Sequence, residues 1–180
     1  MACFYKGQNF IMMQLVLRAY TLDDAKPLAT LANDYQVSKN LRDTFPYPYL
    51  ESDAHRFLQF VNKLPPDKGI EYAITVDGLF AGAIGITFSS DIYQKNGEIG
   101  YWLGRPYWNK GIISRAIRML VEYTFDNYPI HKITAEVFAT NIGSQKALEK
   151  NGFILEGICK EHAYKEEIYH DVHLYALFDK

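Results

Sequence analysis

The dipeptide Asp77-Gly78 sets the local fold of this 180-residue chain more firmly than any other pair of residues. It separates two apolar, strand-like runs, EYAITV over residues 71–76 and LFAGAIGITF over residues 79–88. Asp-Gly between two such runs is typical of a type I′ turn, because both turn residues need positive φ angles. The sequence therefore predicts a β-hairpin over residues 71–88.

Hydrophobic periodicity divides the rest of the chain into further strands and helices. We expect strands over residues 14–20, 97–103, 131–138, 153–158 and 171–178. We expect helices from Thr21 to about Ala32, from Ser52 to about Leu64, from residue 112 to about Asn127 and from Asn141 to Lys150. An extended loop rich in aromatic residues is expected over residues 40–50, and a polar loop over residues 159–170. This order predicts a single α/β (α+β) domain around one twisted sheet, residues 13–180, after an N-terminal extension, residues 1–12.

Composition and charge argue against several classes of partner. The formal net charge of −2 favours neither nucleic acid nor an anionic membrane. No run of about 18 apolar residues could span a bilayer. Cys3 and Cys159 are too few for a disulfide framework, which favours reduced thiols and a cytoplasmic protein. His162, His170 and His173 lack metal-ligand spacing, so no metal site is predicted.

The stretch YWNKGIISRA, residues 107–116, joins a predicted strand to a predicted helix. The first N–H groups of a helix have no partner within it, and together with the helix dipole they attract phosphate. The stretch matches neither GxxxxGK[ST] nor GxGxxG, the two common phosphate-binding patterns. Its residues alone leave a purely structural turn and a phosphate-binding turn equally open.

Four segments in fixed order carry a resemblance to a known family. They are EIGYWL (98–103), RPYWNKGIISRA (105–116), EVFATNIGSQKALEKNGFILEG (136–157) and DVHLYAL (171–177). With them, the chain resembles the GCN5-related N-acetyltransferase (GNAT) family, in the branch of the ribosomal-protein N-terminal acetyltransferases. The resemblance covers about residues 14–178. It implies a mixed, mostly antiparallel sheet of six to seven strands, with about four helices and splayed central strands.

The resemblance implies that acetyl-coenzyme A donates an acetyl group to a primary amine, with no metal involved. It places the pyrophosphate on the turn from Asn109 to Ser114 and the pantetheine arm along Ile99 to Leu103. Asn109 stands where many relatives have glycine, and asparagine tolerates a left-handed backbone better than most residues. The residues implied in coenzyme binding are Ile99, Gly100, Tyr101, Trp102, Leu103, Asn109, Lys110, Gly111, Ile112, Ile113, Ser114 and Asn141.

The resemblance also implies catalytic roles for Glu98 and Ser144. Glu98 would take the proton from the amine, directly or through water; the alternative is a strand-end glutamate that holds a cation. Ser144 would lie near the coenzyme sulfur as the acid, although Asn141 and Ser144 at a helix start are also ordinary capping residues. Tyr101, Tyr164 and Tyr169 are the other candidates for the acid.

The acceptor is expected to meet two loops, residues 40–50 and 159–171, with Phe45, Tyr47 and Tyr49 as contacts. The resemblance implies a protein N-terminus as the acceptor. A small amine, such as a polyamine, an amino sugar or an antibiotic, is the alternative within the same chemistry. A catalytically idle domain that binds acetyl-coenzyme A is the alternative from another class. Either a monomer or a homodimer agrees with the sequence.

Overall fold

The predicted hairpin is present in the computed structural model, which describes residues 13–180. Strands β2 (Gly69–Val76) and β3 (Leu79–Phe88) pair antiparallel across Asp77 and Gly78, whose φ angles are 50° and 81°. Both values are positive, as a type I′ turn requires. The predicted extension, residues 1–12 with Cys3, lies outside the described residues.

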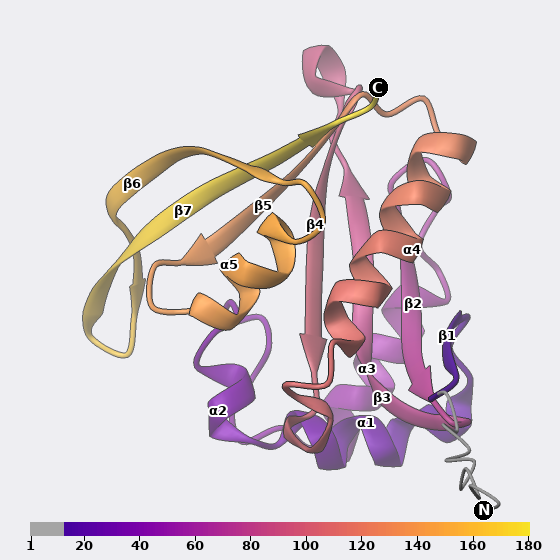
Figure 1. Cartoon of the computed structure of the whole chain (residues 1–180). Helices are drawn as coiled ribbons and strands as arrows, with labels where there is room; N and C mark the ends of the chain where they lie inside the picture. The colour runs from indigo at the N-terminus through magenta and orange to yellow at the C-terminus, as the bar shows by residue number, and fades with distance from the viewer. Residues whose placement is uncertain (1–12) are drawn as a thin grey trace, which may run out of the picture.

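Seven strands form one mixed sheet in the order β1-β2-β3-β4-β5-β7-β6 (Figure 1). The remaining strands are β1 (Leu15–Arg18), β4 (Asn96–Leu103), β5 (Lys132–Phe138), β6 (Ile154–Lys165) and β7 (Ile168–Phe178). The helices are α1 (Ala25–Ala32), α2 (Tyr35–Ser38), α3 (Glu51–Val61), α4 (Ile112–Asn127) and α5 (Ile142–Glu149), with short 3-10 turns at Leu22–Asp24, Asp91–Tyr93 and Arg105–Tyr107. The predicted fold class is confirmed. Among residues 13–180, no helix is both long and apolar enough to cross a membrane.

The sheet has a buried apolar cluster on each face, because helices cover both. On one face Ile84 and Ile133 pack beneath Ile117 and Leu120 of α4. These α4 residues recur at helical spacing, so that they form one apolar stripe. On the other face α1 and α3 cover Ala73, Ala83 and the partly buried Trp102. Each face therefore has its own core, and only small or apolar side chains fit beneath the helices.

The predicted loop over residues 159–170 is wrong, because β6 and β7 continue through it as a long hairpin. Many side chains of β6 are exposed, so polar residues occupy both of its faces and hide the strand periodicity. The turn is made by Glu166 and Glu167, with φ angles of 50° and 62°, and it lacks the usual Asn-Gly signature. Two smaller corrections are that α3 begins at Glu51 and ends at Val61, and that α2 was not predicted.

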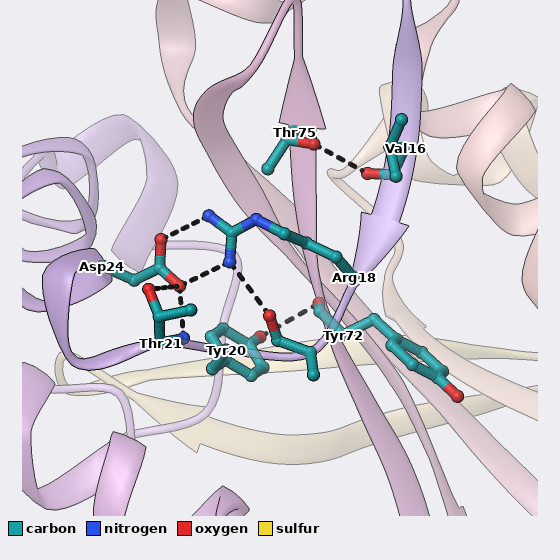
Figure 2. A network of polar contacts seen from close by, with 8 residues as sticks. Val16, Arg18, Tyr20, Thr21, Asp24, Tyr72 and Thr75 are labelled. Atoms are coloured by element: carbon teal, nitrogen blue, oxygen red, sulfur yellow. Dashed lines mark hydrogen bonds and ion pairs between the residues drawn. The ribbon is translucent and has the colours of Figure 1, made fainter.

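A polar network joins the edge strand β1 to the start of α1 (Figure 2). Arg18 donates two hydrogen bonds to the buried carboxylate of Asp24, at 2.7 and 2.6 Å. The backbone N–H of Thr21 donates a third, at 2.8 Å, so that Asp24 also closes the start of the helix. Burial by itself would raise the pKa of Asp24, but these hydrogen bonds outweigh it and lower that pKa.

We expect Asp24→Ala to lower the free energy of unfolding at neutral pH by about 3 kcal/mol, because it breaks a largely buried ion pair. The lowered pKa means that the carboxylate stabilises the fold above its unfolded pKa, and that this contribution disappears as the pH falls below about 4. Urea denaturation at pH 7 and pH 3 measures both effects. Asp23→Ala, at the exposed neighbouring position, is the control. A loss below about 1 kcal/mol would show that Arg18 is satisfied without Asp24.

We expect Glu167→Gly to stabilise the protein by about 0.5–1 kcal/mol, because a left-handed backbone is strained for a residue with a Cβ atom. The greater freedom of glycine in the unfolded chain offsets part of that gain. Thermal unfolding of the two proteins measures the difference. Glu156→Gly, within the extended strand β6, is the matched control and should destabilise. Destabilisation by Glu167→Gly would contradict the strain.

Candidate active site

Strands β4 and β5 form a fork, which confirms the predicted splay. Their parallel pairing covers Asn96 with Lys132, Gly97 with Ile133 and Glu98 with Thr134. Beyond this point β4 continues to Leu103 and β5 to Phe138, but the strands diverge and no longer pair (Figure 1). The edge of β4 that faces β5 therefore presents unpaired backbone groups, which can bond to an extended ligand.

A cavity of about 530 Å³ occupies this fork. Its walls come from the open part of β4, the starts of α4 and α5, and α2 with the residues that follow it. Of the predicted coenzyme-binding residues, it is lined by Tyr101, Trp102, Leu103, Asn109, Gly111, Ile112, Ile113, Ser114 and Asn141. Ile99 is instead a core residue, and Gly100 is exposed. The volume is typical of a pocket for a sizeable organic ligand.

The turn at the start of α4 exposes a set of unbonded N–H groups. Asn109 and Gly111 have φ angles of 59° and 70°, so the predicted left-handed asparagine is present. The first N–H of the helix to bond is that of Arg115, to the Gly111 carbonyl at 3.2 Å. Within residues 13–180 the N–H groups of residues 112–114 have no hydrogen-bond partner, and no side chain caps the helix. A 16-residue helix with such an end binds phosphate groups well.

Three lysines that the sequence analysis missed also line the cavity: Lys39, Lys146 and Lys150. Lys146 and Lys150 are four residues apart, a spacing that places them on one face of α5 and its end. By contrast Lys110, which was predicted to bind the coenzyme, donates to the Pro106 carbonyl at 2.8 Å and is not among the lining residues. The positive charge around the cavity thus comes mainly from residues distant from the turn.

Asn141 caps the start of α5, Ser144 lies in its first turn, and both residues line the cavity. The side-chain oxygen of Asn141 accepts a hydrogen bond from the Ser144 N–H at 3.2 Å. The hydroxyl oxygens of Ser144 and Tyr101 lie 2.8 Å apart. Burial raises the pKa of Tyr101 to about 12, although the hydrogen bond with Ser144 acts in the opposite direction. Tyr101 therefore keeps its proton at neutral pH and can donate it to Ser144.

Glu98 lies at the last paired position of β4, where the fork begins. Its carboxylate is paired with Arg42, which also donates to Glu136 of β5 at 3.1 Å. Burial raises the pKa of Glu98; the Arg42 charge lowers it and the Glu136 charge raises it, so that the net direction is upward. The structure thus shows the strand-end glutamate that holds a cation, and the role of Glu98 as the base stays a prediction.

A second cavity, of about 320 Å³, lies between residues 40–43 and the β6–β7 hairpin. Asn40 and Leu41 line both cavities, so the two spaces share a wall. Arg42 and Glu136 also line the second cavity, and Arg42 connects it to Glu98. Part of the predicted acceptor region therefore forms a pocket, although β6 supplies strand residues where a loop was expected.

The three aromatic residues predicted to contact the acceptor lie outside both cavities. Tyr49 is buried in the core, and Phe45 packs against it and against Trp102, with ring centroids at 4.8 and 5.5 Å. Tyr47 is exposed and faces the ring of Tyr35 at 5.7 Å. Of the three, only Tyr47 is exposed enough to meet an acceptor, and the role of this group stays a prediction.

Comparisons with known proteins agree with this geometry. The family model of the acetyltransferase (GNAT) domain matches residues 14–154. The uncharacterised N-acetyltransferase p20 of Bacillus licheniformis is 31% identical over 171 residues, which are 93% of this chain and 94% of the relative. The ribosomal-protein-serine acetyltransferase of Escherichia coli is 35% identical over 83 residues, 46% of each chain.

A solved structure shows the same fold. RimL, a ribosomal alpha-N-protein acetyltransferase in complex with coenzyme A, superimposes with a TM-score of 0.82 at 24% identity, over 91% of this chain and 93% of its own. The splayed strands and the helix start with free N–H groups agree with the domain match over most of the chain. Together they identify the family. The chain belongs to the GNAT family and is an N-acetyltransferase.

Proposed function

We propose that this enzyme acetylates the N-terminal amine of a protein by direct transfer, with Glu98 as the base and Ser144 as the acid. The observation that carries the proposal is that Glu98 lies where the fork begins and is bonded to Arg42, which lines the smaller cavity. The ribosomal-protein-serine acetyltransferase among the relatives supports a protein acceptor.

The residues around the larger cavity fit acetyl-coenzyme A, whose thioester supplies the activated acetyl group. The unbonded N–H groups of residues 112–114 would hold the pyrophosphate, with Asn109 and Gly111 shaping the turn. Lys39, Lys146 and Lys150 would add charge beside the phosphates. The unpaired edge of β4 would bond to the amides of the pantetheine arm, and one of its N–H groups would stabilise the developing oxyanion.

Glu98 would remove a proton from the acceptor. The carboxylate takes a proton from the ammonium group, directly or through water, and so frees the lone pair of the nitrogen. The neutral amine attacks the thioester carbonyl carbon, the carbon–sulfur bond breaks as the amide forms, and the nitrogen releases its second proton to solvent. A carboxylate whose pKa is raised by burial is a better proton acceptor than one at its ordinary value. Arg42 keeps the group charged before the amine arrives, and the cationic amine would compete with Arg42 for the same carboxylate.

Ser144 would protonate the departing thiolate. Its hydroxyl can donate to the sulfur while it accepts a hydrogen bond from Tyr101, 2.8 Å away. Because the buried Tyr101 keeps its proton at neutral pH, it can replace the proton that Ser144 gives up. Tyr164 and Tyr169 are exposed and pack against each other on the β6–β7 hairpin, a position that favours Ser144 and Tyr101 for this role.

Calorimetry with acetyl-coenzyme A, followed by thiol release on a panel of amines, tests the proposal. The panel contains peptides that begin with Ala, Ser or Thr, together with polyamines and amino sugars. We expect micromolar binding of acetyl-coenzyme A and the highest kcat/KM on a peptide. Faster turnover of a small amine would replace the protein acceptor with the alternative. Binding without turnover of any acceptor would favour the catalytically idle module.

We expect Glu98→Gln to lower kcat by about 10²-fold or more at neutral pH, because it removes the base. The acidic limb of the pH–rate profile, which reports the ionisation of Glu98, should also disappear. Arg42→Gln should keep that limb but move it to higher pH, because the Arg42 charge lowers the pKa of Glu98. Stopped assays from pH 5 to pH 9 measure all three enzymes. An unchanged rate and profile in Glu98→Gln would remove Glu98 from the mechanism.

A further inference from the structure

Glu71, a carboxylate that the proposed mechanism leaves unused, lies on the same face of the sheet as Glu98. The strand register pairs Glu71 of β2 with Gly85 of β3, and Gly85 with Gly100 of β4. Directly paired residues of antiparallel strands point to the same face, and so do residues two apart along one strand. Glu71, Gly85, Gly100 and Glu98 therefore share one face, the one that also carries Trp102.

The two glycines form a floor beneath the Glu71 side chain. A Cβ atom on Gly85 would lie 2.2–2.4 Å from the three carboxyl atoms of Glu71, so the carboxylate rests directly on this glycine. A Cβ atom on Gly100 would meet nothing within 4 Å, and Gly100 is exposed. Figure 1 shows α1 and α3 near the end of the sheet where β4 finishes. The surface above Gly100, between Glu71 on one side and the fork on the other, is therefore open.

Glu71 has no charged or hydrogen-bonding partner within residues 13–180 that would stabilise its ionised form. Burial alone raises its pKa, to about 7. Tyr20 is the titratable neighbour that responds to the Glu71 charge, but its hydroxyl donates to the Tyr72 carbonyl at 3.0 Å. Glu98, also on this face, is held by Arg42. The half-buried carboxylate of Glu71 is partly desolvated and has no partner in the described part of the chain, and a cation beside it would relieve that cost.

We propose that Glu71 is a specificity-determining residue that binds a second, cationic group of the acceptor while the reacting amine lies at the fork near Glu98. This inference rests on the proposed function, because it takes the Glu98 face as the acceptor side. Neighbouring strands lie about 4.8 Å apart, so a carboxylate above β3 is about 5 Å from Gly100 and about 10 Å from the middle of the fork. A cation separated from the reacting amine by a short aliphatic chain spans this distance, as in a diamine or a basic residue next to an N-terminus.

Two pairs of acceptors of equal size test the preference: diaminopentane against pentylamine, and the peptide Ser-Lys-Ala-Ala against Ser-Leu-Ala-Ala. We expect the native enzyme to favour the dicationic member of each pair about tenfold or more in kcat/KM, mainly through KM, after a statistical factor for the symmetric diamine. Glu71→Gln should abolish the preference and leave the affinity for acetyl-coenzyme A unchanged. Gly85→Ala should weaken the preference, because it displaces the carboxylate without removing its charge. Glu122→Gln, exposed on α4 across the sheet, is the matched control.

A measurement without turnover separates this inference from the proposed function. The carboxyl carbon of Glu71 is followed by NMR in the coenzyme A-bound enzyme, assigned with Glu71→Gln. We expect diaminopentane to lower the pKa of Glu71 by about one unit or more, and pentylamine to leave it unchanged. If the pKa of Glu71 shifts but the enzyme acetylates none of the four acceptors, Glu71 binds a cation and the proposed function is rejected. No shift, or a preference that persists in Glu71→Gln, would overturn the role of Glu71.

Discussion

The early end of the β4–β5 pairing is the constraint on which the site depends. Parallel hydrogen bonds join only three residue pairs, and the strands then separate although both continue for several residues. The separation leaves backbone groups of β4 unpaired, and it makes room for a cavity that reaches from α4 and α5 to α2. Glu98 occupies the last paired position, so the carboxylate lies where the fork that holds the cavity begins. The antiparallel strands on either side hold the fork open, because β4 remains fully paired with β3 and β5 with β7.

Charges are divided between the two sides of this fork. The coenzyme side presents N–H groups and lysines, all of which favour phosphate. The opposite side presents the carboxylates of Glu98, Glu136 and Glu71, with Arg42 between the first two. Carboxylates around a single guanidinium favour the approach of a cationic amine, and burial keeps Glu98 basic. Loop residues 40–43 are held to the β6–β7 hairpin by the Lys165–Asp43 ion pair at 2.7 Å, and so the acceptor pocket depends on contacts between distant segments.

Local patterns predicted the elements well where one face of each element is buried. The Asp77-Gly78 turn, the apolar stripe of α4 and the capped start of α5 depend on neighbours within a few residues, so sequence reasoning could find them. It failed at the β6–β7 hairpin, because an exposed two-stranded arm has no buried face to impose an apolar alternation. A turn of two glutamates in left-handed conformation gives no sequence signal either. Sequence reasoning could not tell which aromatic residues of the loop over residues 40–50 are buried, and Tyr49 lies in the core with α1 and α3.

The amino-acid sequence alone determines the order of most strands and helices and the turn geometry at Asn109 and Gly111, because short-range backbone preferences decide both. It also determines the family membership, because motifs in a fixed order carry that information. The juxtapositions at the site do not. Arg42 reaches Glu98 and Glu136 across 56 and 94 residues, and Tyr101 meets Ser144 across 43. The lysines of α5 can be assigned to the cavity, and Glu71 to the face of Glu98, only once the cavity and the sheet register are known. Such long-range pairs are decided by packing of the two cores against the sheet, which no local pattern encodes.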